Sequence, residues 1–181
     1  MNEYDALERT YARIERLVAN ASDGDLARPT PCADWDVRAL LGHLFNVVAQ
    51  FPVLLRGEQP DWSATPDLGD RHATFRALAD ENLAAWRAPG ALDAPSTLLP
   101  GMKMVDFNLC DAVVHAWDLA RALGEDPALD ADAVALVYET WRNAPVDEGR
   151  KYGAFGPAVD VPVDAPVIDR LLGLLGRQPQ G

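Results

Sequence analysis

The sequence predicts an all-α protein whose main part is a four-helix bundle. Two observations indicate this class: apolar residues recur at steps of three and four over several long segments, and only one short stretch carries a β-hairpin signal. The length of 181 residues suits one domain, and 49% hydrophobic residues are enough to build a buried core. We therefore expect a single domain over residues 1–181, in which residues 144–181 form an extended tail and a short helix packed on the bundle.

Apolar stripes at helical spacing predict the four long helices. Their expected ranges are about 4–18, 35–56, 72–87 and 105–123. Asp34 is the expected N-cap of the second helix, and Pro52 is expected to kink that helix or to end it early. Gly124 is expected to end the fourth helix in the left-handed conformation. Residues 28–32 contain two prolines, so an ordered loop rather than a helix is expected there.

The rest of the chain predicts shorter elements. Residues 96–104 place a Pro-Gly turn between two short apolar runs, which suggests a small β-hairpin. Asp130 is expected to cap a fifth helix. Residues 144–165 contain many glycines and prolines and are expected to lie extended over the bundle. A last short helix is expected over residues 166–175, with proline at its first position.

The charge of the chain excludes several classes of partner. Asp and Glu number 28 against 16 Lys and Arg, which gives a formal net charge of -12. Such a surface repels phosphate backbones and anionic lipids, so we expect neither a nucleic acid nor a membrane as partner. No apolar run long enough to span a membrane and no signal-peptide pattern is evident, which predicts a cytoplasmic protein. Long helices with several tryptophans permit a homodimer.

Two of the three histidines lie in apolar helical segments and form a candidate metal site. Asp111 precedes His115 by four residues, so the carboxylate and the imidazole lie one turn apart on one helical face. His43 would complete a set of two imidazoles and one carboxylate, as in catalytic zinc and non-haem iron sites. The alternative is a pair of hydrogen-bonded core histidines. Asp118 is expected to orient or cap a neighbour rather than to bind metal, and His72 to be exposed to solvent.

Other reactive side chains give weaker signals. Cys32 is a candidate nucleophile, but only Arg28 is basic near it in sequence, so a small buried thiol is expected. Cys110 is expected in the core, and the two cysteines lack the spacing of a zinc site or a disulfide scaffold. Neither a phosphate-binding loop nor a nucleophile elbow occurs. Four tryptophans are expected within helices and in the core: Trp35, Trp86, Trp117 and Trp141.

Two segments resemble the metal-site helices of the DinB/YfiT-like superfamily. Residues 30–44 contain Trp-Asp-Val-Arg-Ala-Leu-Leu-Gly-His, and residues 111–124 contain Val-His-Ala-Trp-Asp-Leu-Ala. The ending over residues 153–177 is also similar to the actinobacterial branch of this superfamily. That branch is related to the metal-binding domain of mycothiol-dependent maleylpyruvate isomerase, so the resemblance covers most of the chain.

This resemblance implies a bundle with up-down-down-up helix order and a divalent ion held by His43, Asp111 and His115. Zinc is the first expectation, and nickel, iron and manganese suit the same donors. The isomerase has glutamate at the position of Asp111 and carries an additional C-terminal domain. Its substrate-binding and catalytic residues are therefore not carried over to this chain.

The expected activity is that of a metal-dependent S-transferase or isomerase-like enzyme. A low-molecular-weight thiol of the mycothiol type would be the cosubstrate, because a metal ion lowers the pKa of a thiol and the thiolate can attack an electrophile. The alternative is a non-catalytic metal-binding bundle that acts as a sensor, a buffer or a partner-docking protein. This choice rests on family analogy, and one fold can host unrelated functions.

Overall fold

The computed structural model describes residues 1–32, 34–97, 99–151 and 153–179, which are helical and contain no β-strand. The all-α prediction is therefore confirmed. The helices are α1 (Glu3–Asn20), α2 (Val37–Leu55), α3 (Arg71–Trp86), α4 (Met104–Leu123), α5 (Ala131–Trp141), α6 (Val146–Lys151) and α7 (Val167–Leu174). Two short 3-10 turns, η1 (Asp23–Asp25) and η2 (Ala91–Asp93), lie in the connections.

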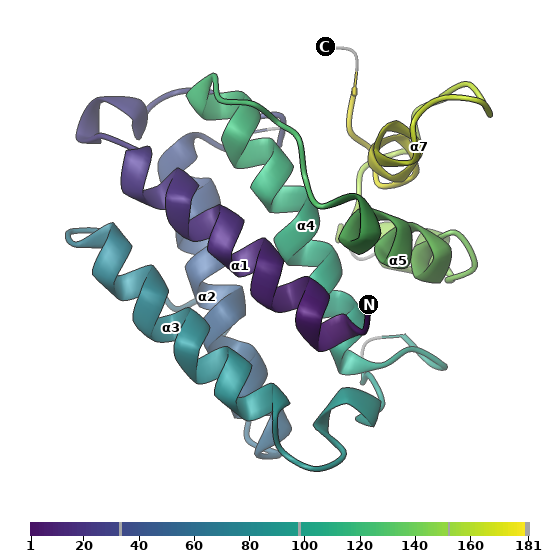
Figure 1. Cartoon of the computed structure of the whole chain (residues 1–181), viewed down its shortest axis with the longest axis horizontal. Helices are drawn as coiled ribbons and strands as arrows, with labels where there is room; N and C mark the ends of the chain where they lie inside the picture. The colour runs from purple at the N-terminus through teal and green to yellow at the C-terminus, as the bar shows by residue number, and fades with distance from the viewer. Residues whose placement is uncertain (33, 98, 152, 180–181) are drawn as a thin grey trace.

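The first two helices are consecutive in the chain but lie diagonally across the bundle. α1 packs mainly on α3 and α4, and α2 packs on the same two helices. Figure 1 shows α1 in front and α2 behind, with α3 and α4 to either side. As a result, α2 and α4, which carry the candidate metal ligands, are direct neighbours.

Burial follows the predicted stripes. Four of the five expected inner residues of α1 are buried: Leu7, Tyr11, Ile14 and Val18. The fifth, Tyr4, is partly buried. Each fully buried side chain of this size contributes about 1.5–3 kcal/mol relative to an exposed one. Two expected helix ends are also confirmed, because Asp130 accepts hydrogen bonds from the first amides of α5, and Gly124 ends α4 with φ 74°.

The start of α2 differs from the prediction. Asp36, not Asp34, is the N-cap, and its Oδ1 accepts from the Ala39 amide at 2.8 Å. Asp34 has a left-handed φ of 66° and belongs to the loop before the helix. Pro52 does not end α2 early, because the helix continues to Leu55. A proline leaves the carbonyl four residues earlier without its helical donor, and here Asn82 Nδ2 of α3 donates to that Val48 carbonyl at 2.7 Å.

The expected hairpin is reduced to a single bridge between Pro95 and Lys103. Ser96 N donates to the Met102 carbonyl at 2.8 Å, and no strand forms among the described residues of this turn. Leu98, which lies in the predicted hairpin, is outside the described residues. The prediction of a fully extended segment after residue 144 is wrong, because α6 forms there. A Cβ atom on Gly149 would lie 2.8 Å from the Phe155 ring, so the glycine allows this short helix to pack closely.

By length and composition, α2 is the one helix of the described residues that could cross a membrane. This helix is not an uninterrupted apolar run, because Arg38, His43 and Asn46 lie within it. In addition, 56% of the apolar window is buried inside the bundle. Packing against α3 and α4 accounts for its apolar character, as in a core helix of a soluble protein.

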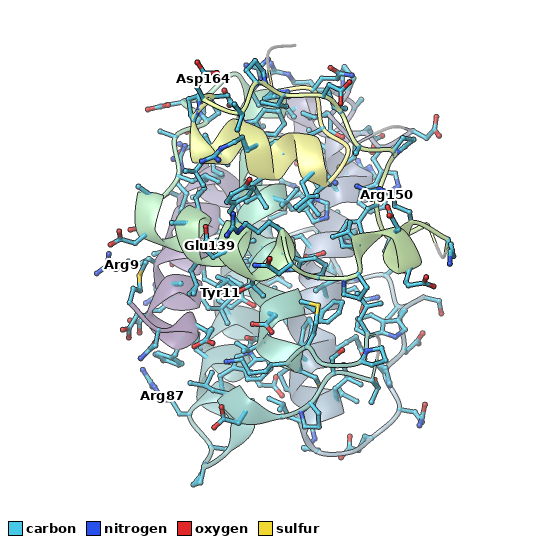
Figure 2. All side chains as sticks on the ribbon, turned by 90° about the vertical axis from the view of Figure 1, so that its right-hand side faces the viewer. Arg9, Tyr11, Arg87, Glu139, Arg150 and Asp164 are labelled. Atoms are coloured by element: carbon cyan, nitrogen blue, oxygen red, sulfur yellow. The ribbon has the colours of Figure 1, made fainter. Side chains whose placement is uncertain are left out.

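The C-terminal tail packs on the bundle through α7, which lies against α5 (Figure 1). Figure 2 shows this face directly, with α7 above α5 and with α6, which carries Arg150, to one side. Two glycines allow the close packing of the tail on itself. A Cβ atom on Gly173 would lie 2.4 Å from Val161, and one on Gly176 would lie 2.7 Å from the Gly156 Cα atom.

A buried polar network joins three helices in the core. Asn108 Oδ1 on α4 accepts from Trp86 Nε1 on α3 at 2.8 Å, and Asn108 Nδ2 donates to the Tyr11 hydroxyl on α1 at 2.9 Å. Asn108 is fully buried, so neither partner can turn to water instead. This network fixes the relative positions of α1, α3 and α4.

We expect Asn108→Ala to lower the free energy of unfolding by about 2–4 kcal/mol, because two buried groups lose their partner and a cavity forms. Urea denaturation followed by circular dichroism measures the change. The control is Asn143→Ala at the exposed end of α5, which should change stability by less than about 0.5 kcal/mol. Equal losses in both variants would contradict the role of the network.

Candidate metal centre

The three residues predicted as metal ligands come together between α2 and α4. His43 Nε2 lies 3.0 Å from Asp111 Oδ1, and His115 Nε2 lies 3.5 Å from the same oxygen. One ligand atom from each residue lies within 4.8 Å of the others. The spacing of four residues on α4 and the contact of α4 with α2 produce this cluster, which could hold one metal ion.

The three side chains of the cluster differ in their exposure to solvent. The His43 and Asp111 side chains keep 33% and 21% of their surface exposed, whereas His115 keeps 8%. A small molecule can therefore approach His43 and Asp111, while His115 forms the inner wall.

The Asp111 carboxylate and the His43 imidazole shift the pKa values of one another toward the charged forms. Burial alone would raise the pKa of Asp111, but the two neighbouring imidazoles outweigh burial and lower it. For His43, burial would lower the pKa, and the Asp111 carboxylate outweighs this and raises it. Asp111 Oδ2 is buried without a hydrogen-bond partner. An anionic carboxylate with a free buried oxygen beside two imidazoles is a suitable donor set for a divalent cation.

Asp118 forms a hydrogen bond with the ring nitrogen of His115 that faces away from Asp111. This contact agrees with the orienting role expected of Asp118. Its Oδ2 atom lies 2.9 Å from His115 Nδ1. The hydrogen bonds to His115 and Arg177 outweigh the effect of burial and lower the pKa of Asp118. An ionised carboxylate can only accept, so Nδ1 of His115 carries the proton and donates it. Nε2 is then the ring nitrogen that faces Asp111.

Two further side chains reach the same oxygen of Asp118. Cys32 Sγ donates to Oδ2 at 3.0 Å, and Arg177 Nη2 donates to it at 3.0 Å. Cys32, His115 and Asp118 form a second group whose ligand atoms lie close enough together for a metal ion. Its cysteine is a poor ligand in this state, because burial and the Asp118 charge raise the pKa of the thiol to about 12.

Sequence reasoning missed Arg177 and placed Arg28 beside Cys32 instead. Arg28 turns away and pairs with Asp25 and with the Leu123 carbonyl. Arg177 follows α7 and lies next to Asp118 only because the tail folds back on the bundle. No local pattern in the sequence could have indicated this contact.

Trp35 also differs from its expected place in a helix. It lies in the loop before α2, and its ring centroid is 4.8 Å from that of His43 and 5.9 Å from that of His115. Thr30 fixes the loop, because its hydroxyl and its amide both donate to the Trp35 carbonyl. The left-handed Asp34 provides the turn that brings the indole over the imidazoles.

The other candidates lie away from the cluster or in the core. His72 is about half exposed, as expected, and its Nε2 lies 3.0 Å from Glu15 Oε1 on α1. Cys110 is buried in the core as predicted, with the tryptophans Trp86, Trp117 and Trp141 also buried within helices.

Comparison with known proteins identifies the family. The sequence profile described as the mycothiol maleylpyruvate isomerase N-terminal domain matches residues 7–120. The chain belongs to this family. The match includes all three predicted ligands and confirms the resemblance to the DinB-like superfamily, whose members bind metal. It ends before α5, so Arg177 lies outside it.

Two curated relatives cover almost the whole chain. They are the uncharacterized proteins MT0763 and Rv0738 from two strains of Mycobacterium tuberculosis. Each is 30% identical over 197 residues, which covers 98% of this chain and 98% of the relative. No solved structure gives a significant match.

We expect Cys32 of the folded protein to react with iodoacetamide at pH 8 about 10³-fold more slowly than an unhindered cysteine, because so little thiolate is present. Mass spectrometry of the alkylated peptides measures the rate at Cys32. Asp118→Asn should accelerate the reaction, since it removes the negative charge beside the thiol. Rapid labelling of Cys32 in the native protein, at the rate seen after unfolding, would contradict the raised pKa.

Proposed function

We propose that His43, Asp111 and His115 bind one divalent metal ion and that the protein uses this centre in thiol-dependent S-transferase or isomerase-like chemistry. The observation that carries the proposal is the convergence of three donor groups on one point. His43 Nε2 and His115 Nε2 lie 3.0 and 3.5 Å from Asp111 Oδ1, and the buried Oδ2 of Asp111 has no hydrogen-bond partner. A divalent cation placed among these groups would accept a lone pair from each of them.

The donor set suits several divalent ions. Zinc is the first expectation for two imidazoles and a carboxylate, and nickel, iron and manganese accept the same ligands. Among the described residues, no further His, Cys, Asp or Glu joins this group. Three protein ligands leave coordination positions for a small molecule, which is the arrangement of catalytic rather than structural zinc sites.

The chemistry follows from the metal and from the walls of the centre. When bound, a divalent ion supplies Lewis acidity, which favours ionisation of a thiol at neutral pH. Trp35 lies against both imidazoles and gives the centre an aromatic neighbour. Asp118 keeps the proton of His115 on Nδ1, so that Nε2 stays available. Cys32 is protonated and takes no part as a nucleophile.

The family supports a low-molecular-weight thiol as cosubstrate. Its description names mycothiol, and the relatives found here are mycobacterial. We infer that a thiol of the mycothiol type and a small electrophile are the partners, and that the protein acts in the cytoplasm. Both cysteines are free, which suits a reducing compartment.

Elemental analysis of the purified protein is expected to find about one divalent ion per chain, and His43→Ala with His115→Ala is expected to remove it. Loss of two of three ligands leaves only Asp111, which cannot hold the ion alone. His72→Ala is the matched control, because this histidine pairs with Glu15 outside the cluster. A parent protein that takes up no metal under any loading would refute the metal centre.

The metal-loaded protein is expected to accelerate consumption of an electrophile only when a low-molecular-weight thiol is present. Chromatography of a panel of thiols and electrophiles measures the loss of both reactants. Asp111→Asn should lower the rate at least about tenfold, since it removes the anionic ligand of the cluster. Stoichiometric metal without turnover across the panel would favour the non-catalytic alternative.

A further inference from the structure

The C-terminal tail reaches the back of the candidate metal centre. Arg177, directly after the end of the tail helix, donates from Nη2 to Asp118 Oδ2 at 3.0 Å, across 59 residues of sequence. The same oxygen accepts the Nδ1 proton of His115 at 2.9 Å. The tail, the buried carboxylate and the inner imidazole therefore form one continuous chain of contacts.

This contact supplies a charge that the carboxylate needs. Asp118 is fully buried, and the Arg177 side chain is only 13% exposed. An ionised carboxylate at such a position is costly unless a cation and hydrogen bonds compensate it. The atoms Asp118 Oδ1 and Arg177 Nε are both buried without partners. They belong to the same ion pair, so the pair can become a two-pronged arginine–carboxylate contact with a small rotation.

We propose that Arg177 is a positioning residue of the metal centre, and that metal binding is coupled to docking of the tail through Asp118 and His115. The proposal rests on the metal centre proposed above. Arg177 fixes Asp118, Asp118 fixes the ring of His115, and His115 presents Nε2 to the ion. Coupling of this kind is reciprocal, so the metal must also stabilise the docked tail.

Backbone hydrogen bonds and close glycine contacts hold the tail in its folded form. The Arg177 amide donates to the Leu172 carbonyl at 2.8 Å, and the Val159 amide donates to the Gly173 carbonyl at 2.9 Å. Gly156 and Gly176 approach so closely that a Cβ atom on Gly176 would clash. Both hydrogen bonds lie within the tail, so hydrogen exchange at these two amides reports whether the tail keeps the fold that brings Arg177 to Asp118.

Two effects of Arg177 on metal affinity oppose each other. Its positive charge repels a cation, but it is the weakest of the groups that shift the pKa values of His43 and Asp111. Loss of a partner that orients a metal ligand costs about 10–100-fold in affinity. Arg177 acts one contact further away, so we expect the lower end of this range and a net loss of affinity when it is replaced.

The experiment measures Zn²⁺ affinity by competition with a chelating dye and hydrogen exchange with and without saturating Zn²⁺. Arg177→Met should bind Zn²⁺ about tenfold more weakly, and Arg177→Lys should recover most of the loss, because lysine retains a charge and a donor. Arg170→Met is the matched control. Arg170 lies on the tail helix and stacks on Tyr138, at 4.9 Å from the ring centroid, so its loss affects the tail without touching Asp118. Its Zn²⁺ affinity should stay within about twofold of the parent.

In the parent protein, Zn²⁺ should slow exchange at the Val159 and Arg177 amides, and this protection should disappear in Arg177→Met. The visible spectrum of the Co²⁺ form should also change in Arg177→Met but not in Arg170→Met. Only Arg177→Met removes a hydrogen bond from Asp118 and thereby alters the orientation of the His115 ring. Protection in the parent can be measured without any variant, so the test does not depend on the folding of Arg177→Met.

Several outcomes would overturn the coupling. The first is Zn²⁺ binding by Arg177→Met that is as tight as in the parent or tighter. The second is a loss of Zn²⁺ affinity in Arg170→Met that equals the loss in Arg177→Met. The third is hydrogen exchange in the tail of the parent protein that does not change when Zn²⁺ is added. In each case the parent still binds metal, so the proposed centre survives. A parent protein that binds no metal would refute the centre itself and the coupling with it.

Discussion

Asp118 carries a buried negative charge, and the site is built around compensating it. Moving a carboxylate out of water costs several kcal/mol unless other groups replace its hydration. Here one oxygen accepts from Cys32 in the loop before α2, from His115 on α4 and from Arg177 in the tail. These three segments lie far apart in the sequence, so Oδ2 receives all three hydrogen bonds only when the loop, the bundle and the tail have reached their final positions.

This constraint gives His115 two different environments. Its Nδ1 side is dry and fixed by the carboxylate, whereas its Nε2 side faces Asp111 and the partly exposed His43. Fixing a ligand from the protected side leaves the open side free for exchange of small molecules. Trp35 packs beside His43 on that side, next to the left-handed Asp34 in the loop before α2.

The parts of the fold that depend on local spacing could be predicted from the sequence. Apolar stripes and capping residues indicated the long helices, and the step of four from Asp111 to His115 indicated that these two side chains lie next to each other. What failed depended on contacts between distant segments. Pro52 was expected to interrupt α2, yet Asn82 of another helix satisfies the freed Val48 carbonyl. Arg177 reaches Asp118 through the path of the tail, which no spacing rule encodes.

The hydrogen-bonded core histidine was the main alternative to a metal ligand, and the geometry can be weighed against it. A proton on Nε2 of His115 would provide a donor toward Asp111 Oδ1 at 3.5 Å, and His43 Nε2 can donate to the same oxygen at 3.0 Å. Protons on these two nitrogens would satisfy Oδ1, but the buried Oδ2 of Asp111 would remain without a partner. Leaving such an atom unpaired costs about 1–3 kcal/mol. A divalent ion can take lone pairs from both imidazoles and from the carboxylate at once, so it satisfies the whole cluster better than a proton does.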